Sequence, residues 1–202
     1  MGKRFWLVNL FSLGAVILIV ASFFYPLWSL SAKAVQYETE FPEGLRVFAY
    51  LHKLGGEIYE LNIMSKWIGA HFPERVPEHV IFPLLFGGVA LLCFASIFFN
   101  DWKRRILGLA LLLFVALAIA GAGSLQWRLY TFGHARDPYP PADIPDFTIP
   151  LVGSTRFMNW KITTNLNIGA YAMGLAALLV TLAYVITAWE YRKESAKEGK
   201  AP

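Results

Sequence analysis

The residues best suited to chemistry are four histidines, all in the two long polar stretches of the chain. They are His52, His71, His79 and His134. Imidazole is a common metal ligand, and Met64 could add the soft thioether that suits copper. An isolated loop histidine can equally be solvated or make a structural hydrogen bond. No two of these histidines have the spacing of a recognised metal motif, so both interpretations stay open.

His134 is followed by Asp137, and the two could share a face of one helical turn. A histidine beside a carboxylate can bind a metal, or the carboxylate can simply orient the ring. A hydrogen bond between them would pin the loop, and Asp137 before Pro138 is also a turn signal. The predicted metal ligands, with copper as the possible ion, are His134, Asp137, His71 and His79.

Other reactive motifs are scarce in this sequence. The single cysteine, Cys93, lies in an apolar run, so it predicts neither a disulfide nor a haem-attaching C-x-x-C-H motif. The chain shows no nucleophile-and-base pair and no phosphate-binding loop. The sequence therefore favours a non-catalytic protein, with a quinone-site or other membrane enzyme subunit as an alternative.

Four apolar runs predict the helices that would hold the candidate histidines in place. The chain is 56% hydrophobic, and each run approaches the roughly 20 residues that a membrane-crossing helix needs. The predicted spans are 5–30, 80–99, 106–126 and 167–189. Backbone polar groups in lipid must be satisfied within the segment, so the prediction is an all-α, four-helix membrane bundle formed as one domain by residues 1–202. The first span is too long for a signal peptide and is expected to stay as an anchor.

The basic residues predict the orientation of this bundle. Nine of the 18 Lys and Arg residues lie in three short segments on one side of a four-span topology: Lys3, Arg4, Lys103, Arg104, Arg105, Arg192, Lys193, Lys197 and Lys200. Short cytoplasmic loops carry such an excess. Both termini are therefore expected in the cytoplasm of a bacterial cytoplasmic (inner) membrane, with loops 31–79 and 127–166 outside. The net charge of +4 needs no nucleic-acid partner.

The first outer loop, residues 31–79, shows local structure. Residues 45–51 are rich in β-branched and aromatic types and could form a short strand. Residues 57–68 carry apolar side chains at helical spacing, and Gly69 follows as a stop signal. This pattern predicts a short amphipathic helix lying on the bundle or in the interface.

The second outer loop, residues 127–166, is rich in proline and aromatic residues. Prolines stiffen the path, and a stiff segment loses less entropy on binding. The loop is therefore predicted to dock a partner protein. The predicted partner-binding residues are Trp127, Tyr130, Pro138, Tyr139, Pro140 and Phe147.

Both loops together carry a resemblance. The first contributes Phe41-Pro42-Glu43-Gly44-Leu45, Glu60-Leu61-Asn62 and Trp67-Ile68-Gly69; the second contributes Leu129-Tyr130, Gly133-His134, Asp137-Pro138 and Phe147-Thr148-Ile149-Pro150-Leu151-Val152-Gly153. These runs resemble small multi-span membrane proteins encoded with nitrous oxide reductase maturation genes or with copper and cytochrome c respiratory genes. The chain departs from that pattern at Ser65-Lys66-Trp67, where an Asn-His-Tyr-type run is expected.

The resemblance implies a place in a respiratory chain. Its first implication is an accessory or assembly subunit of a membrane-associated respiratory metalloenzyme, docking a membrane or periplasmic respiratory protein through the outer loops. Its second is an extracytoplasmic copper-handling protein using His134. The departure removes a histidine from the first loop, which weakens the second implication for that loop.

Overall fold

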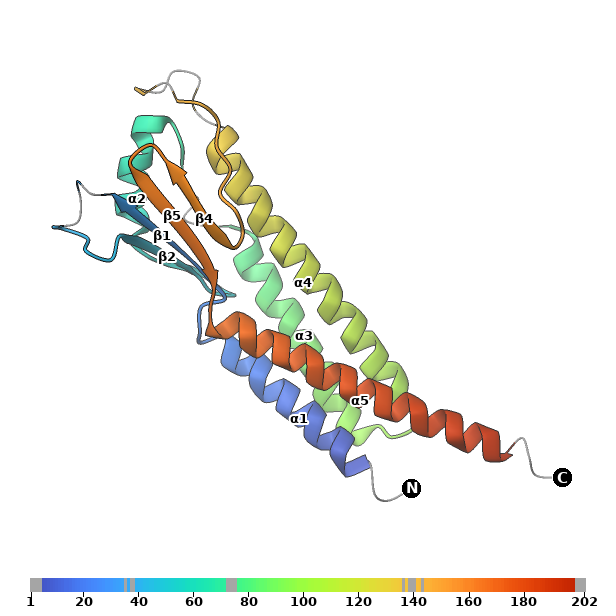
Figure 1. The fold of residues 1–202 in the computed structure, drawn as a ribbon. Helices are drawn as coiled ribbons and strands as arrows, with labels where there is room; N and C mark the ends of the chain where they lie inside the picture. Colours follow the sequence, from blue (N-terminus) through green and yellow to red (C-terminus); the bar gives the residue numbers. More distant parts are fainter. Residues whose placement is uncertain are drawn as a thin grey trace.

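The computed structural model describes residues 5–34, 36, 39–71, 76–135, 137, 141–142 and 144–198. Four of its helices are long and apolar enough to cross a membrane: α1 (Phe5–Ser22), α3 (Glu78–Phe98), α4 (Lys103–His134) and α5 (Ile168–Glu198). In the bundle, α1 packs against α3 and α5, and α4 packs against the same two helices. Both described ends of the chain lie at the end of the bundle away from the sheet (Figure 1).

A five-stranded antiparallel sheet lies at the other end of this bundle (Figure 1). Its strands are β1 (Trp28–Ala34), β2 (Leu45–Ala49), β3 (Leu54–Gly56), β4 (Gly153–Phe157) and β5 (Trp160–Leu166), and their spatial order is β3-β2-β1-β5-β4. The central strand β1 pairs with β2 on one side and with β5 on the other. The prediction of an all-α protein is therefore wrong, because the two outer loops jointly form this sheet.

The first predicted span, 5–30, ends too late. Helix α1 ends at Ser22, since Pro26 lacks a donor and its ring disfavours helix in the residue before it. From Trp28 onward, buried residues alternate with more exposed ones, as on a half-buried strand. Trp28, Leu30 and Ala32 are buried in the core. Residues 28–30, predicted as the end of the first membrane helix, therefore begin the central strand of the sheet.

Of the other predicted spans, 80–99 lies within two residues of α3, whereas 106–126 and 167–189 stop short of the ends of α4 and α5. Helix α4 continues past residue 126 to His134, because Leu129 and Phe132 keep a helical spacing and pack against the sheet. Gly133 allows this contact: a Cβ built there would lie 1.9 Å from the carbonyl oxygen of Phe147. Much of the predicted extended loop 127–166 is thus helix or strand.

The short helix of the first loop is confirmed as α2 (Ile58–Ser65), followed by a 3-10 turn, η2 (Lys66–Ile68). It packs against the sheet, so the predicted position on the bundle or in the interface is wrong. Gly69 ends η2 in the left-handed conformation, with φ of 68°. Leu61 of α2 joins the buried face of the sheet and the end of α4 in one hydrophobic core. A separate core fills the bundle and contains the buried Cys93.

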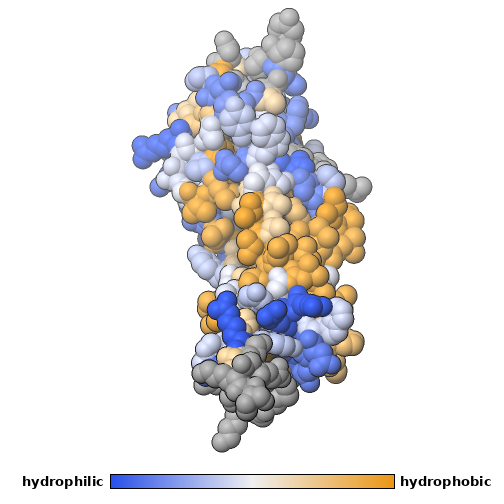
Figure 2. Space-filling model, turned by 90° about the vertical axis from the view of Figure 1, so that its right-hand side faces the viewer, coloured by the Kyte–Doolittle hydropathy of each residue, from blue (hydrophilic) through white to orange (hydrophobic). Residues whose placement is uncertain are grey.

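A band of hydrophobic surface separates the two hydrophilic ends of the molecule (Figure 2). The band contains exposed apolar residues of α3, α4 and α5, such as Leu84, Leu112 and Leu178. Exposed apolar surface of this extent suits contact with lipid. The four helices thus give the chain the build of a membrane protein.

Candidate functional sites

The predicted metal ligands lie in three different places. His71 and Asp137 form a contact between the two loops, with 3.4 Å from Nε2 to Oδ2. The ring of His134 instead stacks on Tyr130 at 3.9 Å, and its Nδ1 lies 2.9 Å from the Tyr130 carbonyl oxygen. His79 is on the first turn of α3.

Met64, the predicted thioether ligand, is packed against the core of the sheet. Within the described part of the chain, no three His, Cys, Asp or Glu side chains are grouped to hold a metal ion. The metal site thus stays a prediction. Of its four predicted ligands, the structure brings only His71 and Asp137 into contact.

The predicted partner-binding residues also differ in their surroundings. Trp127 and Tyr130 stack at 5.9 Å on an exposed face of α4. Phe147 is half-buried and lies between Phe132 and Phe157, so it serves the core of the sheet. Pro138, Tyr139 and Pro140 lie outside the described residues.

A second apolar surface, not foreseen from the sequence, runs along α2 and η2. Tyr59, Ile63 and Trp67 are exposed by 69%, 45% and 67% and follow one another at four-residue spacing, so they share a helical face. We call these three residues the outer stripe. The buried face, with Leu61 and Ser65, points to the sheet. The four-residue spacing of these three side chains is visible in the sequence, but the helix was predicted from the apolar residues of its buried face alone.

The outer stripe lies far from the bundle. Helix α4 has 32 residues, so at 1.5 Å per residue it is about 48 Å long, which exceeds a hydrocarbon core of about 30 Å. The segment just beyond its outer end contacts η2: the Asp137 N–H donates to the Gly69 carbonyl at 2.9 Å, and the Ala142 N–H donates to the Trp67 carbonyl at 2.9 Å. The stripe therefore stands at the level of the sheet-side end of α4, about 48 Å along that helix from Lys103 and so farther than a hydrocarbon core of about 30 Å would extend.

An apolar pocket lies between the bundle and the sheet. Its volume is about 480 Å³, and side chains of α3, α4 and α5 line it beneath Trp28 and the β2–β3 turn. The lining includes Phe82, Phe114 and Met173, and it also includes small residues of α5. The volume falls within the range of roughly 300–1,000 Å³ that small-molecule sites occupy.

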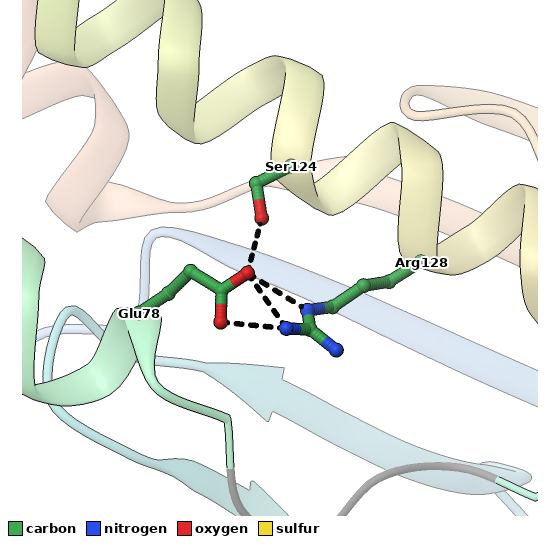
Figure 3. A network of polar contacts seen from close by, with 3 residues as sticks. All are labelled: Glu78, Ser124 and Arg128. Carbon is green, nitrogen blue, oxygen red and sulfur yellow. Dashed lines mark hydrogen bonds and ion pairs between the residues drawn. The ribbon is translucent and has the colours of Figure 1, made fainter.

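A charged network lies at the rim of this pocket (Figure 3). Glu78 begins α3, and Arg128 and Ser124 share a face of α4 one turn apart. Arg128 donates through Nε and Nη2 to Oε1 of Glu78 at 3.2 and 2.6 Å, and through Nη2 to Oε2 at 2.6 Å. Ser124 Oγ donates to the same carboxylate at 2.7 Å. The network joins the start of α3 to α4 at the rim of the pocket.

No protein-family model matches this sequence, and a search of curated proteins finds no match either. Three features of the described residues could bind another molecule: the outer stripe on α2 and η2, the stacked Trp127 and Tyr130 on α4, and the apolar pocket with its charged rim.

Proposed function

We propose that this chain is a non-catalytic accessory or assembly subunit that docks a partner protein outside the membrane. In this proposal the bundle crosses a bacterial cytoplasmic membrane with both termini inside. The support is the charge placement: Lys103, Arg104 and Arg105 begin α4, and Arg192 and Lys193 lie toward the end of α5. Both groups lie at the end of the bundle opposite the sheet (Figure 1).

The observation that carries the docking role is the outer stripe. Large apolar side chains exposed together and out of reach of lipid mark a protein interaction surface. Tyr59 and Trp67 are also of the residue types that most often dominate binding energy at interfaces. The partner would be a folded protein with an apolar groove that accepts these two rings.

The stacked pair on α4 provides a second contact on the same side of the membrane. Trp127 and Tyr130 are exposed, and the rigid stack with His134 presents flat aromatic surface with little entropy to lose. A membrane-bound partner could contact this face of α4 while its outer domain meets the stripe. The resemblance of the loops makes respiratory metalloenzyme systems the first partners to examine.

Site-specific photo-crosslinking in native membranes tests this proposal. A photoreactive phenylalanine analogue at position 67 should give one adduct of defined mass, whereas the same residue at Lys161, exposed on β5, should give none. The single substitution Ile63→Asp should remove the adduct without changing the amount of chain in the membrane, because it places a charge in the middle of the stripe.

Three outcomes would reject the proposed role. These are equal adducts at positions 67 and 161, an adduct that survives Ile63→Asp, and an adduct that contains only a second copy of this chain. An adduct that contains a respiratory enzyme subunit would support the respiratory assignment as well as the docking role.

A further inference from the structure

The apolar pocket opens sideways, through the surface of the bundle. Among its lining residues, Val115 and Ile119 of α4 and Gly174 of α5 are exposed at the outside of the bundle. Counted from Lys103 at 1.5 Å per residue, Val115 and Ile119 lie about 18 and 24 Å along α4. In the proposed membrane placement the opening is therefore within the hydrocarbon core, on the sheet side of its middle.

The upper end of the pocket reaches the polar boundary of the membrane. On the same scale, Ser124 and Arg128 lie about 32 and 38 Å along α4, where a core of about 30 Å gives way to headgroups. A continuous path thus runs from the lateral opening to the charged rim. It offers apolar lining at the depth of lipid tails and ionic groups at the depth of headgroups.

Small residues on α5 create the space. Small residues at helical spacing often let helices approach closely, but Ala170, Gly174 and Ala177 line the pocket instead. A Cβ added to Gly174 would meet no atom within 4 Å. Met173 is the larger α5 side chain in the lining, and beside it these small residues leave a channel between α4 and α5.

We propose that the pocket holds an acyl chain of a phospholipid from the sheet-side leaflet, with its phosphate beside Arg128. Apolar walls that open into the bilayer are matched by hydrocarbon, since lipid tails are as apolar as the side chains that line the pocket. Arg128 uses two nitrogens on Glu78, and the third, Nη1, points away from the carboxylate (Figure 3). Guanidinium donors pair well with phosphate oxygens.

This inference depends on the proposed membrane placement but not on the docking role. It assigns the bundle a resident lipid that would brace α4 and α5 beneath the sheet. The Glu78–Arg128 pair would hold the rim open and keep Arg128 at headgroup level. A phospholipid fits both the apolar lining and the ionic rim, because its phosphate carries the charge that Arg128 attracts, whereas a neutral prenyl quinone would offer Arg128 only its carbonyl oxygens.

Photolabelling with lipid of defined structure tests the assignment. The whole chain would be reconstituted in nanodiscs of phosphatidylethanolamine and phosphatidylglycerol that carry a diazirine on one acyl chain. Mass spectrometry should then locate labels on pocket residues such as Phe114 and Met173. Gly174→Leu should remove these labels, since the new side chain occupies the channel.

Gly123→Leu is the matched control, because Gly123 is also a helical glycine with nothing within 4 Å of an added Cβ, yet it does not line the pocket. It should label as the unaltered chain does. Labels on Leu84 and Leu91, which are exposed on α3, report whether the bundle is in the bilayer at all.

Pocket labels that survive Gly174→Leu, or that are absent while Leu84 and Leu91 are labelled, would overturn the lipid site and leave the membrane placement standing. Loss of labels at all four positions would overturn the placement too. Displacement of the pocket labels by added ubiquinone would overturn the phospholipid assignment in favour of a quinone.

Discussion

Arg128 on α4 holds Glu78 on α3 in a two-point ion pair, with Nη2 2.6 Å from each carboxylate oxygen. The Arg128 and Glu78 side chains are only 32% and 24% exposed. The pair joins helices whose sequence positions are 50 residues apart, at the level where the bundle meets the sheet. It therefore ties α3 to α4 at the rim of the pocket, close to the sheet.

Removing one partner of this pair should destabilise the chain. Arg128→Gln leaves a half-buried carboxylate without its cation, and hydrogen bonds to charged groups contribute about 1.5–3 kcal/mol each. We expect a free energy of unfolding lower by about 2 kcal/mol, measured by thermal or denaturant unfolding in mild detergent.

The control for this loss is Arg46→Gln, which breaks the exposed pair between Arg46 and Glu43. An exposed ion pair is worth roughly 0–1 kcal/mol, so this variant should unfold almost as the unaltered chain does. Equal losses in the two variants would contradict the structural role assigned to Arg128.

Gly133 should tolerate no side chain. Alanine there would place a Cβ against the carbonyl oxygen of Phe147, and forced repacking of this kind typically costs about 1–3 kcal/mol. Gly123→Ala on the same helix meets open space and should instead stabilise the chain by roughly 0.5–1 kcal/mol. Opposite signs for the two substitutions, measured by denaturant unfolding, would confirm the contact. Equal signs would show that α4 does not approach residue 147 so closely.

Copper binding should not depend on His134. Its ring stacks on Tyr130 and its Nδ1 lies 2.9 Å from a carbonyl of the same helix, so the ring already has its partners within α4. We expect His134→Ala to leave any copper binding unchanged in isothermal titration of the purified chain. Stoichiometric binding that is lost in this variant would revive copper handling as the function, with His71→Ala as the variant to measure next.

The four long apolar helices could be predicted from the sequence, because the composition of each segment is enough to indicate a helix. A run of apolar residues must be helical in lipid whatever surrounds it, and Gly69 ends its short helix through its own backbone freedom. Pro26 also marked the end of α1, but the apolar Leu27 and Trp28 behind it concealed the change from helix to strand.

The sheet could not be predicted in the same way because its pairing is not local. β1 and β5 are separated by the whole of α3 and α4, yet their pairing joins the strands of the two loops into one sheet. The contact between His71 and Asp137 could not be predicted for the same reason, since it depends on how the two loops lie relative to each other. The pocket could not be predicted from the sequence either, because a small residue on a helix can let a neighbouring helix pack closely or can leave an empty space.

The pairing of the two outer loops can be tested by cross-linking. Lys33 on β1 lies opposite Lys161 on β5, and both side chains are exposed. Directly opposite residues in an antiparallel pair have Cβ atoms about 4.5–5.5 Å apart, close to disulfide reach. Lys33→Cys combined with Lys161→Cys should therefore form an intramolecular disulfide under mild oxidation, seen as a mobility shift that a reductant reverses.

Lys33→Cys combined with Asn165→Cys is the control for register. Asn165 pairs with Ser29 and lies four residues further along β5, or about 13 Å from position 161. The buried Cys93 should not compete, because oxidant reaches the exposed pair first. Cross-linking only at 33–161 would establish that residues from both loops form one sheet in this register. Efficient cross-linking at 33–165 would mean that the strands slide past each other, and the buried positions of Trp28 and Ile162 would then need a different explanation.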